Sequence, residues 1–183
     1  MTFPQTTGHA RPTSRETHLV ELVDPAGTPL GVATVADAHR APGILHRAFS
    51  VLLVDGEGRL LLQRRAAYKT RFPLRWANTC CGHPEPGQDV REAAAKRLAA
   101  EMGLAIDELR EVGQFVYQAA DPATGRAEHE YDHVLVGQVA PNVRPVPDPY
   151  EVADWRWAHP ADLAADTDDY APWLDPVVRL GTQ

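Results

Sequence analysis

The sequence predicts an α/β sandwich, in which strands surround one central helix. Two observations carry this prediction. Several segments are rich in β-branched and aromatic residues or alternate apolar with polar residues, which is typical of strands. A single Ala-rich segment has the apolar spacing and the closing glycine of a helix. One helix among many strands favours a sandwich over a parallel doubly wound sheet.

The N-terminal part of the chain predicts a tail followed by two pairs of strands. Residues 1–16 are polar and rich in proline and threonine, so we expect a mobile tail, and we expect residues 17–183 to form one domain. Residues 18–35 predict two strands joined by an Asp-Pro-Ala-Gly turn. Residues 46–65 predict a hairpin whose turn lies at residues 55–58.

The C-terminal part holds the predicted helix, at residues 88–104, where Leu98 and Met102 lie four apart and Gly103 ends the pattern. The remaining segments add strands and further helical turns. They are two strands at 109–119 and 128–139, a Pro-rich loop at 141–152, a short strand at 153–160, and two helical segments at 160–167 and 171–180.

Composition and charge exclude several classes of protein. The net charge of −7 and the pI near 5.6 argue against a general nucleic-acid-binding protein, which would be basic. No apolar run approaches the length of about 18 residues that a membrane span needs. The first residues lack the apolar core of a secretory signal, which predicts a cytoplasmic protein with reduced thiols. We therefore expect no disulfide between Cys80 and Cys81.

Five residues form a candidate metal-binding set: His39, His46, His83, Glu128 and Glu130. In a strand, the two glutamates would share one face with their Cα atoms about 7 Å apart, and burying two like charges there is costly unless a cation neutralises them. Three imidazoles with two carboxylates suit Zn²⁺ or Mn²⁺ better than Mg²⁺. The ordinary alternatives stay open, because loop histidines and strand glutamates are usually solvated and the sequence does not show that the segments converge.

Residues 87–104 nearly follow the Nudix signature, in which a loop and a helix present glutamates to magnesium and a diphosphate. Arg97 and Ala100 stand where that signature has metal-binding glutamates, while Glu101 and Gly103 are kept. A Nudix hydrolase needs those carboxylates to hold the metals that activate water, so their loss argues against hydrolysis. The alternative for Arg97 and Glu101 is a solvent-facing ion pair of i,i+4 spacing.

The chain resembles the type I isopentenyl-diphosphate isomerases, which have the Nudix fold without Nudix hydrolysis. The resemblance runs from about Leu19 to Leu180 and is most specific in the Trp-x-Asn-Thr-Cys-Cys-x-His-Pro block at residues 76–84. The segments "AHRAPGILHRAFS", "RLAAEMG", "EHEYDHVL" and "YAPWL" also carry it. It implies a Nudix-like α/β/α sandwich with a mixed sheet and one central loop–helix element. It also implies an enzyme that interconverts isopentenyl and dimethylallyl diphosphate through a carbocation-like state.

The resemblance implies roles for individual residues. Cys81 and Glu130 would be the acid/base pair on opposite faces of the substrate, with Tyr117 beside Glu130. A Cys81 thiolate and the Trp173 ring could stabilise the carbocation-like state. A tightly bound divalent metal, Mn²⁺ or Zn²⁺ and less readily Mg²⁺, would be held by His39, His46, His83, Glu128 and Glu130. Glu101 would contribute to a Mg²⁺ bound with the substrate diphosphate. The substrate would contact Arg65, Lys69, Arg97 and Trp173.

One position departs from the family pattern. Val35 stands where many relatives have a lysine near the diphosphate, which predicts weaker diphosphate affinity or a modified prenyl diphosphate substrate. A Nudix-type diphosphate hydrolase and a non-catalytic metal- or thiol-binding module are the rival functions. We expect a small-molecule prenyl diphosphate as the partner, no nucleic acid or membrane, and a monomer or weak dimer.

Overall fold

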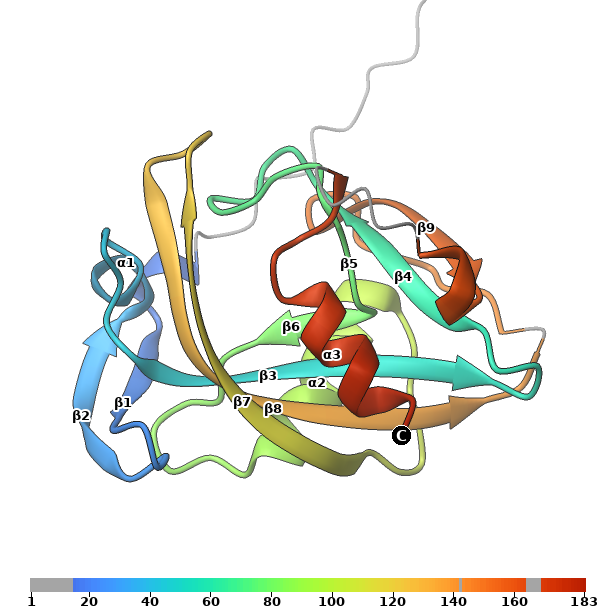
Figure 1. Cartoon of the computed structure of the whole chain (residues 1–183), viewed down its shortest axis with the longest axis horizontal. Coiled ribbons are helices and arrows are strands. Elements are labelled where there is room, and N and C mark those ends of the chain that lie inside the picture. Colours follow the sequence, from blue (N-terminus) through green and yellow to red (C-terminus); the bar gives the residue numbers. More distant parts are fainter. Residues whose placement is uncertain (1–14, 142, 164–168) are drawn as a thin grey trace, which may run out of the picture.

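The computed structural model describes residues 15–141, 143–163 and 169–183 and arranges them around one sheet (Figure 1). The strands are β1 (Leu19–Val23), β2 (Pro29–Thr34), β3 (His46–Asp55), β4 (Leu60–Arg65), β5 (Trp76–Ala77), β6 (Cys80–Gly82), β7 (Arg110–Asp121), β8 (Arg126–Val139) and β9 (Val152–Ala158). The helices are α1 (Val35–Ala38), α2 (Val90–Met102) and α3 (Leu174–Gly181). Each strand expected from the sequence is present, and the short strands β5 and β6 are additional.

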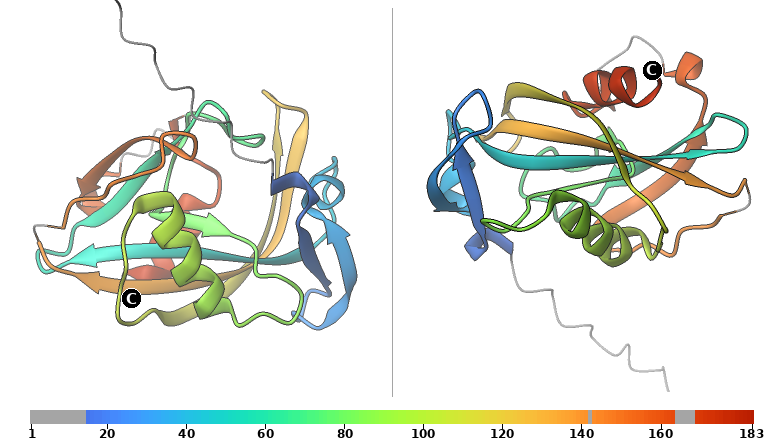
Figure 2. Two further views of the ribbon diagram at one scale, coloured as in Figure 1. Left: turned by 180° about the vertical axis from the view of Figure 1, so that it is seen from behind. Right: turned by 90° about the horizontal axis from the view of Figure 1, so that it is seen from below.

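The long strands β3 and β8 form the centre of the sheet. They pair in parallel along the whole of β3, from His46 opposite Glu130 to Asp55 opposite Val139. Strand β3 also pairs with β1, β4 and β6, in each case antiparallel, so the sheet is mixed. Helix α2 covers one face of the sheet and α3 the other, as the view from below in Figure 2 shows. The predicted α/β/α sandwich with a mixed sheet is confirmed.

Helix α2 packs closely on its face of the sheet because its buried side includes two alanines as well as Leu98 and Met102. The Asp89 carboxylate caps the start of the helix by accepting two backbone N–H groups of the first turn. Gly103, with φ 64°, ends the helix in the left-handed conformation that glycine adopts without strain. The central helix predicted at residues 88–104 is therefore confirmed.

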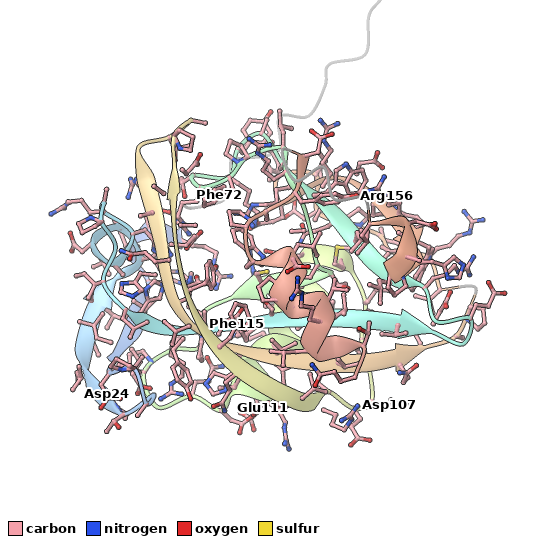
Figure 3. All side chains as sticks on the ribbon, viewed as in Figure 1. Asp24, Phe72, Asp107, Glu111, Phe115 and Arg156 are labelled. Carbon is pink, nitrogen blue, oxygen red and sulfur yellow. The ribbon has the colours of Figure 1, made fainter. Side chains whose placement is uncertain are left out.

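The opposite face of the sheet carries a second apolar cluster beneath α3. Leu52 of β3 and Val177 of α3 are fully buried in it. Phe115 on β7 and Phe72 in the loop between β4 and β5, both labelled in Figure 3, belong to the same cluster. Trp173, immediately before α3, is buried there too.

The two ends of the chain differ in part from expectation. In the helical segment expected at 160–167, the structure has a 3₁₀ turn at Pro160–Asp162. The turn ends there because Leu163, with ψ 88°, is not helical. Residues 164–168 lie outside the described residues. Residues 1–14 of the expected tail also lie outside them, and Arg15–Thr17 form a 3₁₀ turn. No helix in the described parts of the chain is long and apolar enough to cross a membrane.

Candidate active site

Four side chains from different elements meet at one point. His39 follows α1, His46 begins β3, His83 follows β6 and Glu130 lies on β8. One nitrogen or oxygen atom of each lies within 4.8 Å of those of the others, so the group could hold a metal ion. The parallel pairing of β3 with β8 sets His46 directly opposite Glu130. The fold thus brings together four of the five residues in the metal-binding set expected from the sequence.

The backbone fixes the orientation of two of the imidazoles. Nδ1 of His39 donates to the Val35 carbonyl and Nδ1 of His46 donates to the Ile44 carbonyl, each at 2.7 Å. A carbonyl oxygen only accepts, so Nδ1 carries the proton in the neutral ring. Nε2 of each neutral ring then carries a lone pair, and it lies near Glu128 and Glu130 in His39 and near Glu130 in His46. An Nδ1–H bonded to a backbone carbonyl is typical of metal-ligating histidines.

Several polar atoms of this group lack hydrogen-bond partners. Nε2 of His39, Nε2 of His46 and Oε2 of Glu128 are buried and make no hydrogen bond within the described residues. Glu130 Oε1 lies 2.8 Å from Nε2 of His83, but 3.7 and 3.9 Å from the Nε2 atoms of His46 and His39. Buried polar atoms without partners are costly. Because a divalent cation would satisfy all of these lone pairs at once, the residues fit a metal.

Glu128, the fifth residue of the set, lies beside the four-residue group and is not part of it. Its Oε2 is 2.9 Å from Nε2 of His39, without hydrogen-bond geometry. Its Oε1 is 3.2 Å from Nε of Arg71, a nearly buried arginine that offsets the carboxylate charge. Glu128 and Glu130 both face His39, as the alternation of side chains along a strand predicts.

Burial and neighbouring charges set the proton affinities of these groups. Burial lowers the pKa of His83 to about 3, although Glu130 favours its protonation. Burial also opposes a proton on His39, but the adjacent Glu128 and Glu130 carboxylates raise the pKa of His39 to about 9. Burial alone would raise the pKa of Glu130, but the three imidazoles hold it well below the usual range. Glu130 is therefore ionised, as a metal ligand must be.

A buried asparagine holds Cys81 in the wall of the cavity. Cys81 Sγ donates to Asn78 Oδ1 at 3.1 Å, and the same oxygen accepts from Trp173 Nε1 at 3.0 Å. Asn78 Nδ2 donates to the carbonyls of Val51 and Cys80, at 3.0 and 2.9 Å, so its amide is fully bonded. Burial, reinforced by the Asp132 carboxylate, raises the pKa of Cys81 to about 12. The thiolate considered from the sequence is therefore disfavoured in this environment.

The two cysteines have different surroundings, and neither forms a disulfide. Cys80 is fully buried in the core beneath α2, whereas Cys81 lines the cavity. Ser50 Oγ lies 3.7 Å from Cys81 Sγ and donates to Asp132 Oδ2 at 2.7 Å. Burial and the nearby Glu130 raise the pKa of Asp132 well above its usual range. A serine and a buried carboxyl group thus lie behind the Cys81 thiol.

Tyr117 stands opposite Glu130 where β7 pairs with β8. Its hydroxyl donates to Glu130 Oε2 at 2.6 Å, while the other carboxylate oxygen faces the histidines. Its ring stacks on Phe115 and tilts toward Trp173, with centroid distances of 5.5 and 5.9 Å. Burial and the Glu130 charge raise the pKa of Tyr117 well above its usual range, so the hydroxyl stays a donor.

Two cations and two carboxylates form a compact cluster at another part of the cavity. Lys69 Nζ lies 2.9 Å from Glu101 Oε1, and Arg97 Nη2 lies 2.9 Å from Glu151 Oε2. Lys69 also contacts Glu151, and Arg97 also contacts Glu101. The side chains of Arg97 and Glu101 are only 10% and 1% exposed, so the alternative of a solvent-facing pair is wrong. Burial alone would raise the pKa of Glu101, but Lys69 and Arg97 lower it to about 2.

The Arg65 guanidinium group is held by backbone carbonyl groups and an aromatic ring rather than by a carboxylate. Its Nε donates to the Phe72 carbonyl at 3.0 Å and its Nη2 to the Arg71 carbonyl at 2.8 Å. Its guanidinium carbon lies 5.3 Å from the centre of the Trp173 ring, within the range of a cation–π contact. Arg65 therefore keeps its positive charge available to an anion in the cavity.

All these groups surround one cavity of about 190 Å³. The residues expected from the sequence that line it are Arg65, Lys69, Cys81, His83, Arg97, Tyr117, Glu128, Glu130 and Trp173. His39, His46 and Glu101 lie behind its wall, essentially without exposure. The cavity thus combines titratable groups, an aromatic wall and a basic cluster, which suits a ligand with an anionic head and a short apolar body.

Three residues with contacts in the site were not found from the sequence. Asn78 lies within the "NTCC" segment, and an amide beside two cysteines was a signal that could have identified it. Glu151 lies at the end of the Pro-rich loop and Arg71 lies in the β4–β5 loop. No local pattern marks either residue, because their partners Lys69, Arg97 and Glu128 come from distant segments.

Comparison with known proteins agrees with this geometry. Residues 44–180 match the NUDIX domain. An isopentenyl-diphosphate Delta-isomerase of Nocardia farcinica is 61% identical over 165 residues, covering 88% of this chain and 93% of that protein. An isopentenyl-diphosphate Delta-isomerase of Halorhodospira halophila is 46% identical over 164 residues, covering 87% of this chain and 93% of that protein.

Solved structures resemble the fold at low sequence identity. A protein of Deinococcus radiodurans superposes with a TM-score of 0.70 at 20% identity, covering 89% of this chain and 99% of that one. A MutT protein of Methanosarcina mazei has a TM-score of 0.61 at 16% identity, covering 74% of this chain and 92% of that one. These structures support the fold alone, whereas the matched domain and the close relatives define the family. The chain belongs to the isopentenyl-diphosphate Delta-isomerase family of NUDIX-domain proteins.

Proposed function

We propose that the protein interconverts isopentenyl diphosphate and dimethylallyl diphosphate, with Cys81 and Glu130 as the acid/base pair. The observation that carries this proposal is that both side chains line one cavity, which also holds an aromatic wall and a basic cluster. The identity to isomerases over most of the chain supports the same reaction. The lysine and arginine side chains of the cavity can donate hydrogen bonds to a diphosphate, and the aromatic wall suits a five-carbon chain.

The reaction explains why two proton-transfer groups are needed. A proton is added to one carbon of the alkene and another proton is removed from a different carbon, so the double bond moves. An alkene is a very weak base, and its protonation leads to a tertiary, carbocation-like state. An acid and a base on opposite faces of the substrate can complete both transfers without releasing the cation.

The surroundings of the pair suit a cationic intermediate. The Trp173 ring and the ionised Glu130 would stabilise positive charge near the reacting carbons. Asn78 would fix both Cys81 and Trp173, because its Oδ1 accepts from each of them. Tyr117 would hold Glu130 by donating to Oε2. Water must be kept from the reacting carbons during the reaction, because it would otherwise capture the cation.

We assign a tightly bound divalent cation to His39, His46, His83, Glu128 and Glu130. The nitrogen-rich ligand set favours Mn²⁺ or Zn²⁺, with Mg²⁺ as the less suitable alternative. Bound there, a cation would act as a Lewis acid that tunes the proton affinity of the carboxyl group. Glu130 is oriented by His83 on one oxygen and by Tyr117 on the other.

The substrate diphosphate would bind at the basic end, through Arg65, Lys69 and Arg97. Glu101 would contribute to a Mg²⁺ that accompanies the diphosphate, since its carboxylate lies directly behind Lys69 and Arg97. Binding energy from this remote, unreactive group can position the alkene between Cys81 and Glu130.

Deuterium incorporation tests the proposed reaction. Purified protein is incubated with isopentenyl diphosphate and Mg²⁺ in D₂O, and the products are followed by NMR. The expected product is dimethylallyl diphosphate that carries deuterium, with the diphosphate intact. Release of phosphate or of a monophosphate would instead indicate a Nudix-type hydrolase, and no metal-dependent turnover at all would indicate a binding module.

A further inference from the structure

The basic residues around the cavity are mostly neutralised by carboxylates of the protein itself. Lys69 and Arg97 share the carboxylates of Glu101 and Glu151, so the charges of these four groups cancel. A diphosphate carries about three negative charges near neutral pH. These two cations therefore offer it hydrogen bonds but little net charge.

A third cation, Arg71, is also committed to the protein. Its Nη1 lies 3.0 Å from Glu16 Oε1 and its Nε 3.2 Å from Glu128 Oε1. Arg71 is thus neutralised in the same way as Lys69 and Arg97.

Two arginines that line the cavity have no carboxylate partner among the residues that the structure describes. One is Arg65, which bonds only backbone carbonyls and faces the Trp173 ring. The other is Arg15, which lies at the exposed rim of the cavity on the 3₁₀ turn Arg15–Thr17. Among the arginine and lysine side chains around the cavity, these two supply the positive charge that is not already balanced within the protein.

The turn that carries Arg15 is fixed from both sides. The His18 N–H donates to the Arg15 carbonyl at 3.0 Å, and the His18 carbonyl accepts from the Val35 N–H at 2.8 Å. Glu16 accepts from Thr70 Oγ1 at 2.8 Å and from Arg71 Nη1 at 3.0 Å. These contacts tie the turn to α1 and to the β4–β5 loop, two segments that border the cavity.

We propose that Arg15 is a further substrate-binding residue, which contacts the diphosphate at the rim of the cavity and supplies charge that Lys69 and Arg97 do not. This proposal rests on the proposed function, since it assigns one more contact to the same substrate. Glu16 is a positioning residue that holds the turn. Val35, whose N–H bonds the His18 carbonyl beside this turn, also lines the cavity and carries no charge, whereas Arg15 brings a positive charge to the same part of the chain.

The electrostatics of the rim agree with an anion site there. Burial, reinforced by the like charge of Arg97, lowers the pKa of Arg15 below its usual value, although the carboxylates of Glu151 and Glu101 act in the opposite direction. The Arg97 charge is thus felt at Arg15. An anion bound beside Arg15 would offset this repulsion.

Binding of inorganic pyrophosphate tests Arg15 without depending on turnover. Calorimetric titrations with Mg²⁺ and pyrophosphate compare wild type, Arg15→Gln, Arg15→Lys and the control Arg110→Gln, an exposed arginine on β7 outside this cavity. We expect Arg15→Gln to bind about tenfold more weakly, which equals about 1.4 kcal/mol, while Arg15→Lys keeps most of the affinity. The difference should shrink as salt is raised, because the contact lies at an exposed rim.

Steady-state kinetics with isopentenyl diphosphate add a second readout. Arg15→Gln should raise KM by a similar factor and leave kcat nearly unchanged, because the diphosphate is bound equally in the ground and transition states. Equal pyrophosphate affinity of Arg15→Gln and wild type, or an equal loss in Arg110→Gln, would overturn the assignment of Arg15. Failure of the wild type to isomerise the substrate would contradict the proposed function instead, and the pyrophosphate titrations would still decide the role of Arg15.

Discussion

Replacement of Asn78 by alanine should weaken both the fold and the reaction. Asn78 is fully buried and makes four hydrogen bonds, three of which join conventional donors and acceptors: those to Trp173 Nε1 and to the carbonyls of Val51 and Cys80. Each such bond contributes roughly 0.5–1.5 kcal/mol, and buried partners left unsatisfied add to the cost. The loss in unfolding free energy should therefore be about 2–4 kcal/mol, small enough for the domain to stay folded.

Urea unfolding followed by circular dichroism measures this loss. The transition midpoint should fall while its slope stays the same, since the surface exposed on unfolding is unchanged. The kcat for isopentenyl diphosphate should also fall by about 10- to 100-fold, because Cys81 and Trp173 lose the group that orients them.

Thr79→Val is the matched control for Asn78→Ala. Thr79 is the next residue along the chain and is equally buried. Its hydroxyl accepts from the Leu53 N–H and donates to the Leu61 carbonyl, and neither of these bonds involves Cys81 or Trp173. This variant should lose about 1–3 kcal/mol of stability and keep its kcat. If Asn78→Ala loses less than about 1 kcal/mol, or if both variants lose kcat alike, the assigned role of Asn78 is wrong.

Two further predictions concern the metal and the wall beside it. Elemental analysis of the purified protein should find about one tightly bound divalent ion per chain. The variants His39→Ala, His83→Ala and Glu128→Ala should each lose this ion. Full activity of metal-free protein supplied only with Mg²⁺ and substrate would contradict the five-residue site. In steady-state assays, Val35→Lys should lower KM for isopentenyl diphosphate by about tenfold, since it adds a charge-assisted bond to the diphosphate. The kcat should stay almost unchanged. An unaltered KM would show that position 35 does not face the diphosphate.

The sequence predicted most of the fold because its elements have strong local signals. The helix at residues 88–104 ends at a glycine in the left-handed conformation, and the hairpin of β3 and β4 turns at residues 55–58, as expected. In the described part of the expected helix at 160–167, Leu163 leaves the helical conformation after one 3₁₀ turn. Local pattern alone did not give the parallel pairing of β3 with β8, which joins segments about 80 residues apart.

The sequence predicted the metal-binding residues of the candidate site, but not the residues whose partners are distant in the sequence. The residues of the metal-binding set lie in motifs that the family resemblance identifies, and the fold gathers His39, His46, His83 and Glu130 within 4.8 Å. Arg71 and Glu151 act through partners that are remote in sequence, which no periodicity reveals. Burial also changed one expectation, since the wall of the cavity favours the thiol form of Cys81 over the thiolate.

The central claim, that Cys81 is one of the two proton-transfer groups, is tested most directly by comparing kcat for Cys81→Ala and Cys80→Ala. Cys80 is the adjacent thiol, fully buried in the core, and its replacement changes the same chemical group outside the cavity. We expect Cys81→Ala to lose at least about 10³-fold in kcat, in the upper part of the range for acid–base catalysis, with the fold retained. Cys80→Ala should turn over isopentenyl diphosphate nearly as the wild type does. Equal losses in the two variants would mean that the cysteine pair is structural and would contradict the account.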